Sequence, residues 1–288
     1  QMCIRDRSRT QFHIAYSFSR CASAASKPTI GDVRSLNKAV RTVRSNPVVL
    51  RFHNIKTPGR PCRILGIPDA AYRNNTDGSS QRGQTIFLAA PRERSPDTRG
   101  SLIDYESQRI KRTVLSTTVS ELYSFMKCFG TCQFLRGLWM DLTGESIPIH
   151  LRTDANNLVT TAGSTHLPEQ QETIHMIQML RKEASSGVID DLAHVRTAYC
   201  LADCLTKSSA KPDMLLKAVA TGVLPNVDTS PPFRSTLPHK AYTASVDISR
   251  QRDEWKIEGK TLTRVHHNPR RQLFTPVLKD LPSGITLE

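Results

Sequence analysis

The sequence lacks the long apolar runs and the repeats that define some protein classes at once. None of its 288 residues lies in a run of about 18 consecutive apolar residues, which excludes a membrane-spanning helix. No internal repeat is visible, and apolar periodic segments recur through the middle of the chain, which excludes collagen-like, low-complexity and wholly disordered proteins. Hydrophobic residues make up 38% of the chain, which is enough for one sizeable core with room for polar ends.

A regular cysteine framework is also missing. The 7 cysteines are an odd number at uneven spacing, which argues against a secreted disulfide scaffold and favours a reducing intracellular compartment. Cys128 and Cys132 are one helical turn apart, and so are Cys200 and Cys204. These four thiols are either small buried apolar residues, which is the more common role, or a zinc site.

Acidic residues are scarce at the N-terminal end. Residues 1–60 contain 12 Lys and Arg but 2 Asp and Glu, a net charge of +10. Residues 61–224 carry +1 and residues 225–288 carry +3, so a nearly neutral middle lies between two basic ends. Basic ends indicate a partner that carries phosphate groups, and nucleic acid is favoured over a membrane surface. The alternative is that the basic ends serve solubility alone.

Composition divides the chain into five parts. The sequence begins with Gln1 and continues with Arg and Ser and very little acid, so we expect a fragment whose first residues are disordered or artefactual. The expected parts are an excluded N-terminus (1–27), a short lead-in (28–61), a main domain (62–224), a Pro-rich linker (225–241) and a small basic β-hairpin tail (242–288).

Hydrophobic periodicity and turn residues predict the secondary structure. A helix with Leu36, Ala39 and Val43 on one face should precede a strand at 48–52. Three strands joined by turns should form an antiparallel meander, and Ser116 or Thr117 should cap the long helix that follows. The expected main-domain elements are strands near 64–67, 85–88, 101–105, 147–151 and 188–195, and helices near 116–139, 169–185 and 201–219.

Four acids stand at informative places in this pattern. Asp69 ends the first meander strand, Asp154 follows the fourth strand, Glu121 lies early in the long helix and Asp203 lies at the start of the last helix. If the first and fourth strands are neighbours, these four carboxylates meet, and they cannot all stay charged without cations. Hard oxygen ligands at that density select Mg²⁺ or Mn²⁺, and two such ions can clamp a phosphodiester. Taken singly, each acid also fits an ordinary turn or helix-start role.

The residues around these acids resemble the RNase H domain of copia-type LTR-retrotransposon Pol polyproteins. The resemblance runs in order over about residues 62–210. It rests on Asp69-Ala70-Ala71-Tyr72, Ser80-Gln81-Arg82-Gly83, Ser107-Gln108-Arg109-Ile110-Lys111, Leu115-Ser116-Thr117-Thr118-Val119-Ser120-Glu121-Leu122-Tyr123, Asp154-Ala155-Asn156-Asn157 and Ala202-Asp203-Cys204-Leu205-Thr206-Lys207. The lead-in at 28–61 is similar to the stretch that joins reverse transcriptase to RNase H in such polyproteins.

The resemblance implies an RNase H-like α/β fold, in which helices flank a mixed five-stranded sheet. It implies an endoribonuclease that hydrolyses the RNA strand of RNA–DNA hybrids with two Mg²⁺ or Mn²⁺ ions. It further implies that Asp69, Glu121, Asp154 and Asp203 are catalytic and bind these ions. The partners would be the hybrid and the reverse transcriptase of the same polyprotein, with no membrane. The location would be a cytoplasmic retrotransposon particle or the nucleus.

Six further residues are candidates for contact with the hybrid, namely Arg109, Lys111, Arg112, Asn156, Asn157 and Lys207. For the basic residues, an exposed and solvated charge without a partner is an equally good interpretation.

Two other functions remain open. One is an inactive nucleic-acid-binding remnant, which departures such as Pro68 inside a central strand would fit. The other is an integrase-like strand transferase, which would need a His/Cys zinc module that the N-terminal region lacks.

Overall fold

The computed structural model describes residues 10–55, 57, 59–93, 95–164 and 171–231, together with the backbone of 254–258 and 261–265. The chain forms two compact units, Gln1–Thr236 and Leu237–Glu288. In the second unit, β7 (Glu254–Glu258) and β8 (Thr261–Val265) pair antiparallel, which confirms the predicted hairpin. The rest of the predicted linker and tail lies outside the described residues. No helix in the described part of the chain is long and apolar enough to cross a membrane.

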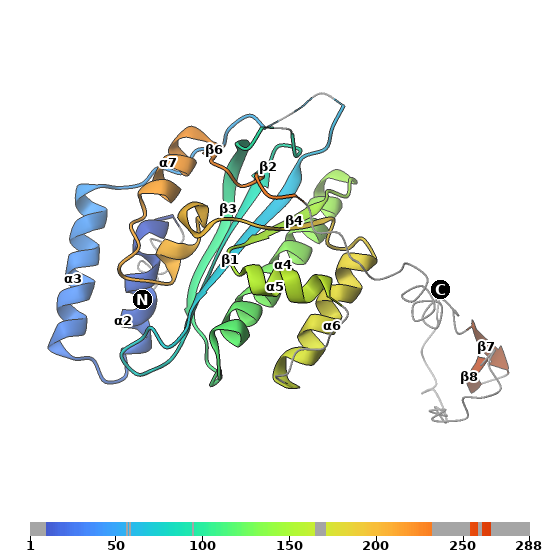
Figure 1. The fold of residues 1–288 in the computed structure, drawn as a ribbon, viewed down its shortest axis with the longest axis horizontal. Coiled ribbons are helices and arrows are strands. Elements are labelled where there is room, and N and C mark those ends of the chain that lie inside the picture. The colour runs from blue at the N-terminus through green and yellow to red at the C-terminus, as the bar shows by residue number, and fades with distance from the viewer. Residues whose placement is uncertain are drawn as a thin grey trace. The chain divides into compact units, whose positions relative to one another are not determined.

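A mixed sheet with the strand order β5-β4-β1-β2-β3-β6 forms the centre of the first unit (Figure 1). The predicted meander is confirmed as β1 (Arg63–Ala71), β2 (Gln81–Ala89) and β3 (Thr98–Arg109). β4 (Ile149–Thr153) lies parallel beside β1, and β5 (Asp191–His194) lies parallel beside β4. A two-residue strand, β6 (Val223–Leu224), pairs with the start of β3, so the sheet has six strands and not five.

Three helices pack on one face of the sheet. They are α4 (Thr117–Thr143), α5 (Asn156–Gly163) and α6 (Gln171–Ser185), and α5 is a helix that the sequence pattern did not predict. The predicted cap of α4 is confirmed, because the Ser116 side chain accepts a hydrogen bond from the backbone N–H of Val119. At Gly66 of β1, an added Cβ would lie 2.8 Å from the Sγ atoms of Cys128 and Cys132, so glycine allows α4 to pack closely on the strand.

The opposite face carries a second hydrophobic core, which includes Leu65, Ile67, Phe87 and Leu215. Its cover comes from η1 (Phe12–Ile14), α2 (Ala15–Ser23), η3 (Asp203–Leu205) and α7 (Asp213–Thr221), while α3 (Ile30–Ser45) packs on α2 and η1. A short helix without buried residues, η2 (Thr197–Tyr199), precedes η3. The expected single helix over 201–219 is wrong, since η3 and α7 are separate. Because Cys128 and Cys132 lie in one core and Cys200 lies in the other, the four thiols form no common zinc site.

The expectation that residues 1–27 lie outside the fold is wrong for the described residues 10–27. Phe12 is fully buried in the second core and makes an edge-to-face contact with the Tyr105 ring. The expected strand at 48–52 is also wrong. The Gln11 side chain donates to the Val48 carbonyl and accepts from the Val48 N–H, both at 3.0 Å, so a side-chain amide takes the place of a partner strand.

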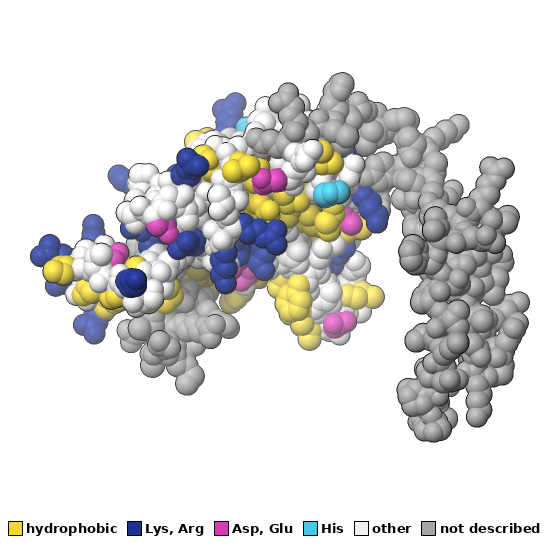
Figure 2. Space-filling model, turned by 90° about the horizontal axis from the view of Figure 1, so that it is seen from below, with side chains coloured by type: hydrophobic (Ala, Val, Ile, Leu, Met, Phe, Trp, Pro, Cys, Tyr) yellow, Lys and Arg dark blue, Asp and Glu magenta, His cyan; other side chains and the backbone are white. Residues whose placement is uncertain are grey.

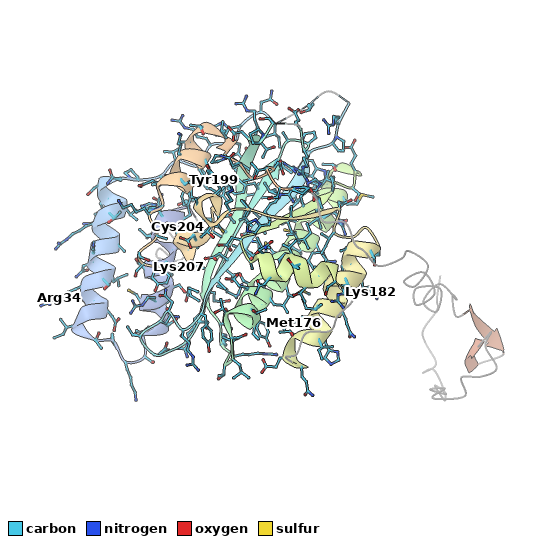
Figure 3. All side chains as sticks on the ribbon, in the orientation of Figure 1. Arg34, Met176, Lys182, Tyr199, Cys204 and Lys207 are labelled. Carbon is cyan, nitrogen blue, oxygen red and sulfur yellow. The ribbon has the colours of Figure 1, made fainter. Side chains whose placement is uncertain are left out.

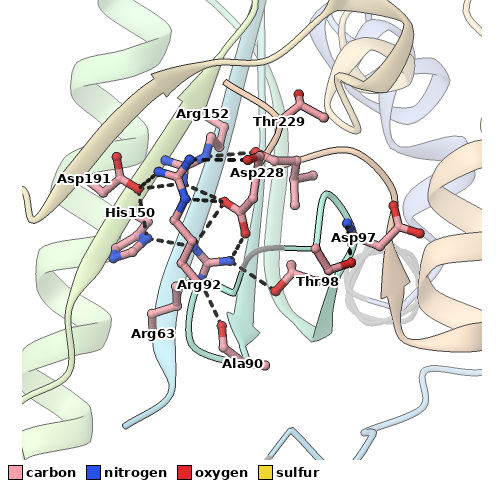
Figure 4. Close-up of polar contacts among 12 residues, drawn as sticks. Arg63, Ala90, Arg92, Asp97, Thr98, His150, Arg152, Asp191, Asp228 and Thr229 are labelled. Carbon is pink, nitrogen blue, oxygen red and sulfur yellow. Dashed lines mark hydrogen bonds and ion pairs between the residues drawn. The ribbon is translucent and has the colours of Figure 1, made fainter. Parts of the chain in front are cut away.

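The expected linker begins later than residue 225, because the chain to Ser230 is held in the fold by a buried charge cluster (Figure 4). Arg63 of β1 and Arg152 of β4 have no exposed surface, and both bind the Asp228 carboxylate. Arg152 Nη2 also lies 2.8 Å from Asp191 Oδ2, and Arg92 Nη1 lies 2.7 Å from the same atom. Although burial alone would raise it, the two buried guanidinium groups hold the pKa of Asp228 below its usual value.

We predict that Asp228→Asn lowers the free energy of unfolding by about 3–5 kcal/mol, because it leaves Arg63 and Arg152 buried with less compensating charge. Urea unfolding measures the change. The matched control is Asp141→Asn, an exposed acid near the end of α4, which should change stability by less than about 0.5 kcal/mol. A loss below about 1 kcal/mol for Asp228→Asn would show that the cluster does not hold this segment.

Candidate functional site

The expected meeting of Asp69 and Asp154 is observed at one end of the sheet. The β1–β4 ladder ends at the Gly66–Leu151 pair, and both chains run on past it, to Asp69 in β1 and to Asp154 just after β4. Carboxylate oxygens of the two residues lie within 4.8 Å of each other. Pro68 falls beyond that ladder, in the part of β1 that pairs only with β2, which explains how a central strand contains a proline.

Two further acids reach the same place from opposite faces of the sheet. Glu121 comes from the second turn of α4 and accepts a hydrogen bond from the backbone N–H of Ala70 in β1. Its charge interacts with those of Asp69 and Asp154. Asp203 comes from η3 on the other face, and its charge also acts on Asp69. The structure therefore places ligand atoms of Asp69 and Asp154 within 4.8 Å of each other, and Glu121 and Asp203 act on Asp69 through their charges.

Small side chains make this close approach possible. Gly83 of β2 pairs with Asp69, and an added Cβ at Gly83 would lie 2.8 Å from side-chain atoms of Leu205 and Thr206. Glycine at this position thus lets the segment that carries Asp203 pack against the sheet. On the other face, Ser124 Oγ of α4 lies 2.6 Å from the Asp69 carbonyl oxygen and 3.1 Å from that of Gly83, which fixes α4 across both strands.

Desolvation and mutual repulsion favour the protonated form of two of these acids. Burial, followed by the nearby charges of Asp69 and Asp154, raises the pKa of Glu121 to about 9. Burial also raises the pKa of Asp69 to about 6, with Asp154 and Asp203 adding to the rise. The Thr206 hydroxyl donates to Asp69 Oδ2 and partly offsets this effect. A nearby cation would offset the repulsion among these carboxylates.

Lys207 is a basic residue that contacts this cluster. Its ammonium forms an ion pair with Asp203 and lies 3.9 Å from Asp69 Oδ2. Burial lowers the pKa of Lys207, but the two carboxylates raise it by more, so the side chain stays charged. The sequence suggested contact with a hybrid for this lysine, and the structure places it among the acids instead of on the open surface.

The other five candidate contact residues lie at the end of β3, in the loop that leads to α4 and at the start of α5. Arg109 ends β3 and forms an ion pair with Asp77 at 2.8 Å, while Lys111 and Arg112 are exposed in the loop that leads to α4. Asn156 and Asn157 are exposed at the start of α5, and Asn157 donates to Thr118, one turn before Glu121. Figure 2 views the molecule from below relative to Figure 1, and Lys and Arg side chains gather near the middle of that face.

Sequence reasoning missed one residue of the site, Cys200. Its Sγ lies within 4.8 Å of carboxylate oxygens of both Asp69 and Asp154, and the residue is buried. Burial, followed by those two charges, raises the pKa of the thiol well above its usual value. The only signal in the sequence is the spacing of Cys200 from Asp203, three residues later.

No protein-family model matches the chain, and no curated protein matches it. Among solved structures, the RNase H1 of Halobacterium salinarum NRC-1 is similar at 17% identity and a TM-score of 0.37, with 50% of this chain and 94% of that chain covered. LC11-RNase H1 in complex with an RNA/DNA hybrid is similar at 15% identity and a TM-score of 0.37, covering 53% and 99%. The protease–reverse transcriptase of prototype foamy virus is similar at 10% identity and a TM-score of 0.33, with 64% of this chain and 28% of that chain covered.

These low identities and scores leave the fold to be judged from the chain itself. An antiparallel meander is followed by a long helix and two parallel strands, with the first strand in the middle of the sheet and helices on both faces. The family resemblance implied such a sheet with five strands, and β6 is a minor addition. The chain has an RNase H-like α/β fold.

Proposed function

We propose that this chain is a metal-dependent endoribonuclease that hydrolyses the RNA strand of RNA–DNA hybrids. The observation that carries the proposal is that carboxylate oxygens of Asp69 and Asp154 lie within 4.8 Å of each other at one end of the sheet, where the charges of Glu121 and Asp203 also act on Asp69. A fold alone hosts many functions, so the argument rests on this site. Structural acids are normally spread apart, because like charges at this density raise each other's pKa.

The donor set fits hard divalent cations. Carboxylate oxygens are the ligands that Mg²⁺ and Mn²⁺ prefer. Burial, followed by the charges of the neighbouring acids, raises the pKa of Asp69 and Glu121, and a bound cation would offset both effects. We assign the four acids as ligands of two such ions. When bound, the ions would activate water and stabilise the leaving oxygen of the phosphodiester.

The other residues in the proposal bind and orient the substrate. Lys111 and Arg112 are exposed in the loop before α4, and we assign them to contacts with phosphates, which Arg109 can also make once it leaves Asp77. Asn156 and Asn157 present amides next to the start of α4, where they can hydrogen-bond the 2′-hydroxyls that distinguish RNA from DNA. Thr206 holds Asp69 in one orientation through its hydroxyl.

The wider context is part of the same proposal and rests on the sequence resemblance. It assigns the chain to the Pol polyprotein of a copia-type retrotransposon, attached to its reverse transcriptase and acting in the element's cytoplasmic particle or in the nucleus. The lead-in at 28–61 would be the connection to the polymerase. Its helix α3 packs on α2 and η1 of the same unit.

A catalytically inactive remnant that still binds nucleic acid is the second candidate. The observation that favours it is Lys207, whose ammonium already lies among the acids at which cations would bind. Such a remnant would bind hybrids in a salt-sensitive way without cutting them.

We predict that the purified chain cuts only the RNA strand of a labelled hybrid in Mg²⁺ or Mn²⁺, and that Asp154→Asn lowers the rate at least about a hundredfold. Loss of a residue that only hydrogen-bonds a metal ligand typically lowers metal affinity or activity about 10–100-fold, and Asp154 is itself a proposed ligand. Gel analysis of the products measures the rate, and the exposed Asp141→Asn serves as a control that should cut at the wild-type rate. A folded wild-type sample that binds the hybrid but never cuts it would favour the remnant.

We also predict that Glu121→Gln stabilises the metal-free protein at pH 8 by at least about 1 kcal/mol. Because the pKa of Glu121 is raised to about 9, the folded state keeps a proton that the unfolded state releases near pH 4.5. The stability that this retained proton on Glu121 gives to the folded state is therefore fully present below about pH 4.5. It is lost as the pH rises toward 9. Urea unfolding in EDTA from pH 4.5 to 8 tests this prediction. A difference between the two proteins that does not change with pH would contradict it.

A further inference from the structure

Lys207 occupies a position that follows directly from its spacing to Asp203. The two residues are four apart across the end of η3, which brings the ammonium onto the Asp203 carboxylate. From there the ammonium also lies 3.9 Å from Asp69 Oδ2, and the Lys207 side chain is partly buried. Figure 3 shows Lys207 beside Cys204, on the segment that runs past the sheet.

The charge of Lys207 acts on the whole acid cluster. It lowers the pKa of both Asp69 and Glu121, against the effect of burial, and it interacts with Asp154 as well. An ammonium among several carboxylates supplies the positive charge that such crowding requires when no metal ion is bound.

A divalent ion and this ammonium compete for the same oxygen atoms. Both require Asp69 and Asp203, and Asp69 Oδ2 already accepts the Thr206 hydroxyl. Two cations about 4 Å apart in a half-buried site repel each other strongly, since water screens them poorly. One of them has to leave when the other binds.

We propose that Lys207 is the built-in counter-ion of the acid cluster, which a divalent cation displaces when it binds. This inference rests on the proposed metal site but not on cleavage. A displaced Lys207 is free to contact a phosphate of the nucleic acid, so metal binding and substrate binding favour each other through one side chain. Lys207 is thus a positioning residue that sets the affinity of the site for cations.

The test is Mn²⁺ binding at pH 8.5, measured by titration calorimetry on the whole chain. We expect Lys207→Met to bind Mn²⁺ at least about tenfold more tightly than the wild type, because a neighbouring positive charge is removed. Lys207→Arg keeps the charge and should bind like the wild type. Lys211→Met, an exposed lysine four residues further on, is the matched control and should also leave the affinity unchanged.

Metal-free stability gives a second, independent measurement. In EDTA, Lys207→Met should unfold at a lower urea concentration than the wild type. Saturating Mn²⁺ should remove or reverse that difference in the unfolding midpoint. Lys207→Gln replaces Lys207→Met if the latter does not fold.

Equal Mn²⁺ affinity of folded Lys207→Met and wild type would overturn the inference, and so would the absence of Mn²⁺ binding in both. Tighter Mn²⁺ binding without any RNA cleavage would support the inference while contradicting the proposed nuclease.

Discussion

The crowding of carboxylates at the end of a buried strand is the constraint on which this molecule depends. Asp69 is almost completely buried, yet its charge interacts with those of three other acids. The surrounding groups all reduce the cost of that arrangement. Thr206 and the Ala70 N–H donate hydrogen bonds, Lys207 supplies positive charge, and Gly83 leaves the space that the last segment needs.

The same strand meets the opposite problem at its other end. β1 begins with Arg63, whose guanidinium is fully buried beside that of Arg152, and here carboxylates are needed to balance positive charge. Asp228 and Asp191 provide them from segments far away in the chain. A central strand with an unmatched charge near each end is stable only when distant parts of the chain come to both ends. The site and the scaffold are therefore linked through β1.

Features that depend on neighbouring residues could be predicted from the sequence. The meander, the long helix with its Ser116 cap and the hairpin follow from periodicity and turn residues. The convergence of the acids was also predictable, because parallel neighbours bring the same strand ends together. Features that depend on single long-range contacts were not predictable. Nothing local indicates that Gln11 bonds the backbone of Val48, that Phe12 fills the second core, or that Cys200 lies against two acids.

The buried contacts of Asp228 affect when this unit can complete its folding during synthesis. The strands that carry Arg63 and Arg152 leave the ribosome well before Asp228 does, and until then two guanidinium groups lack the carboxylate that they share. The sheet cannot reach its final packing while the chain is still being extended through residue 228. Folding of this unit is thus completed late, when its C-terminal segment docks, and a nascent chain interrupted before that point presents an unfinished sheet to chaperones and proteases.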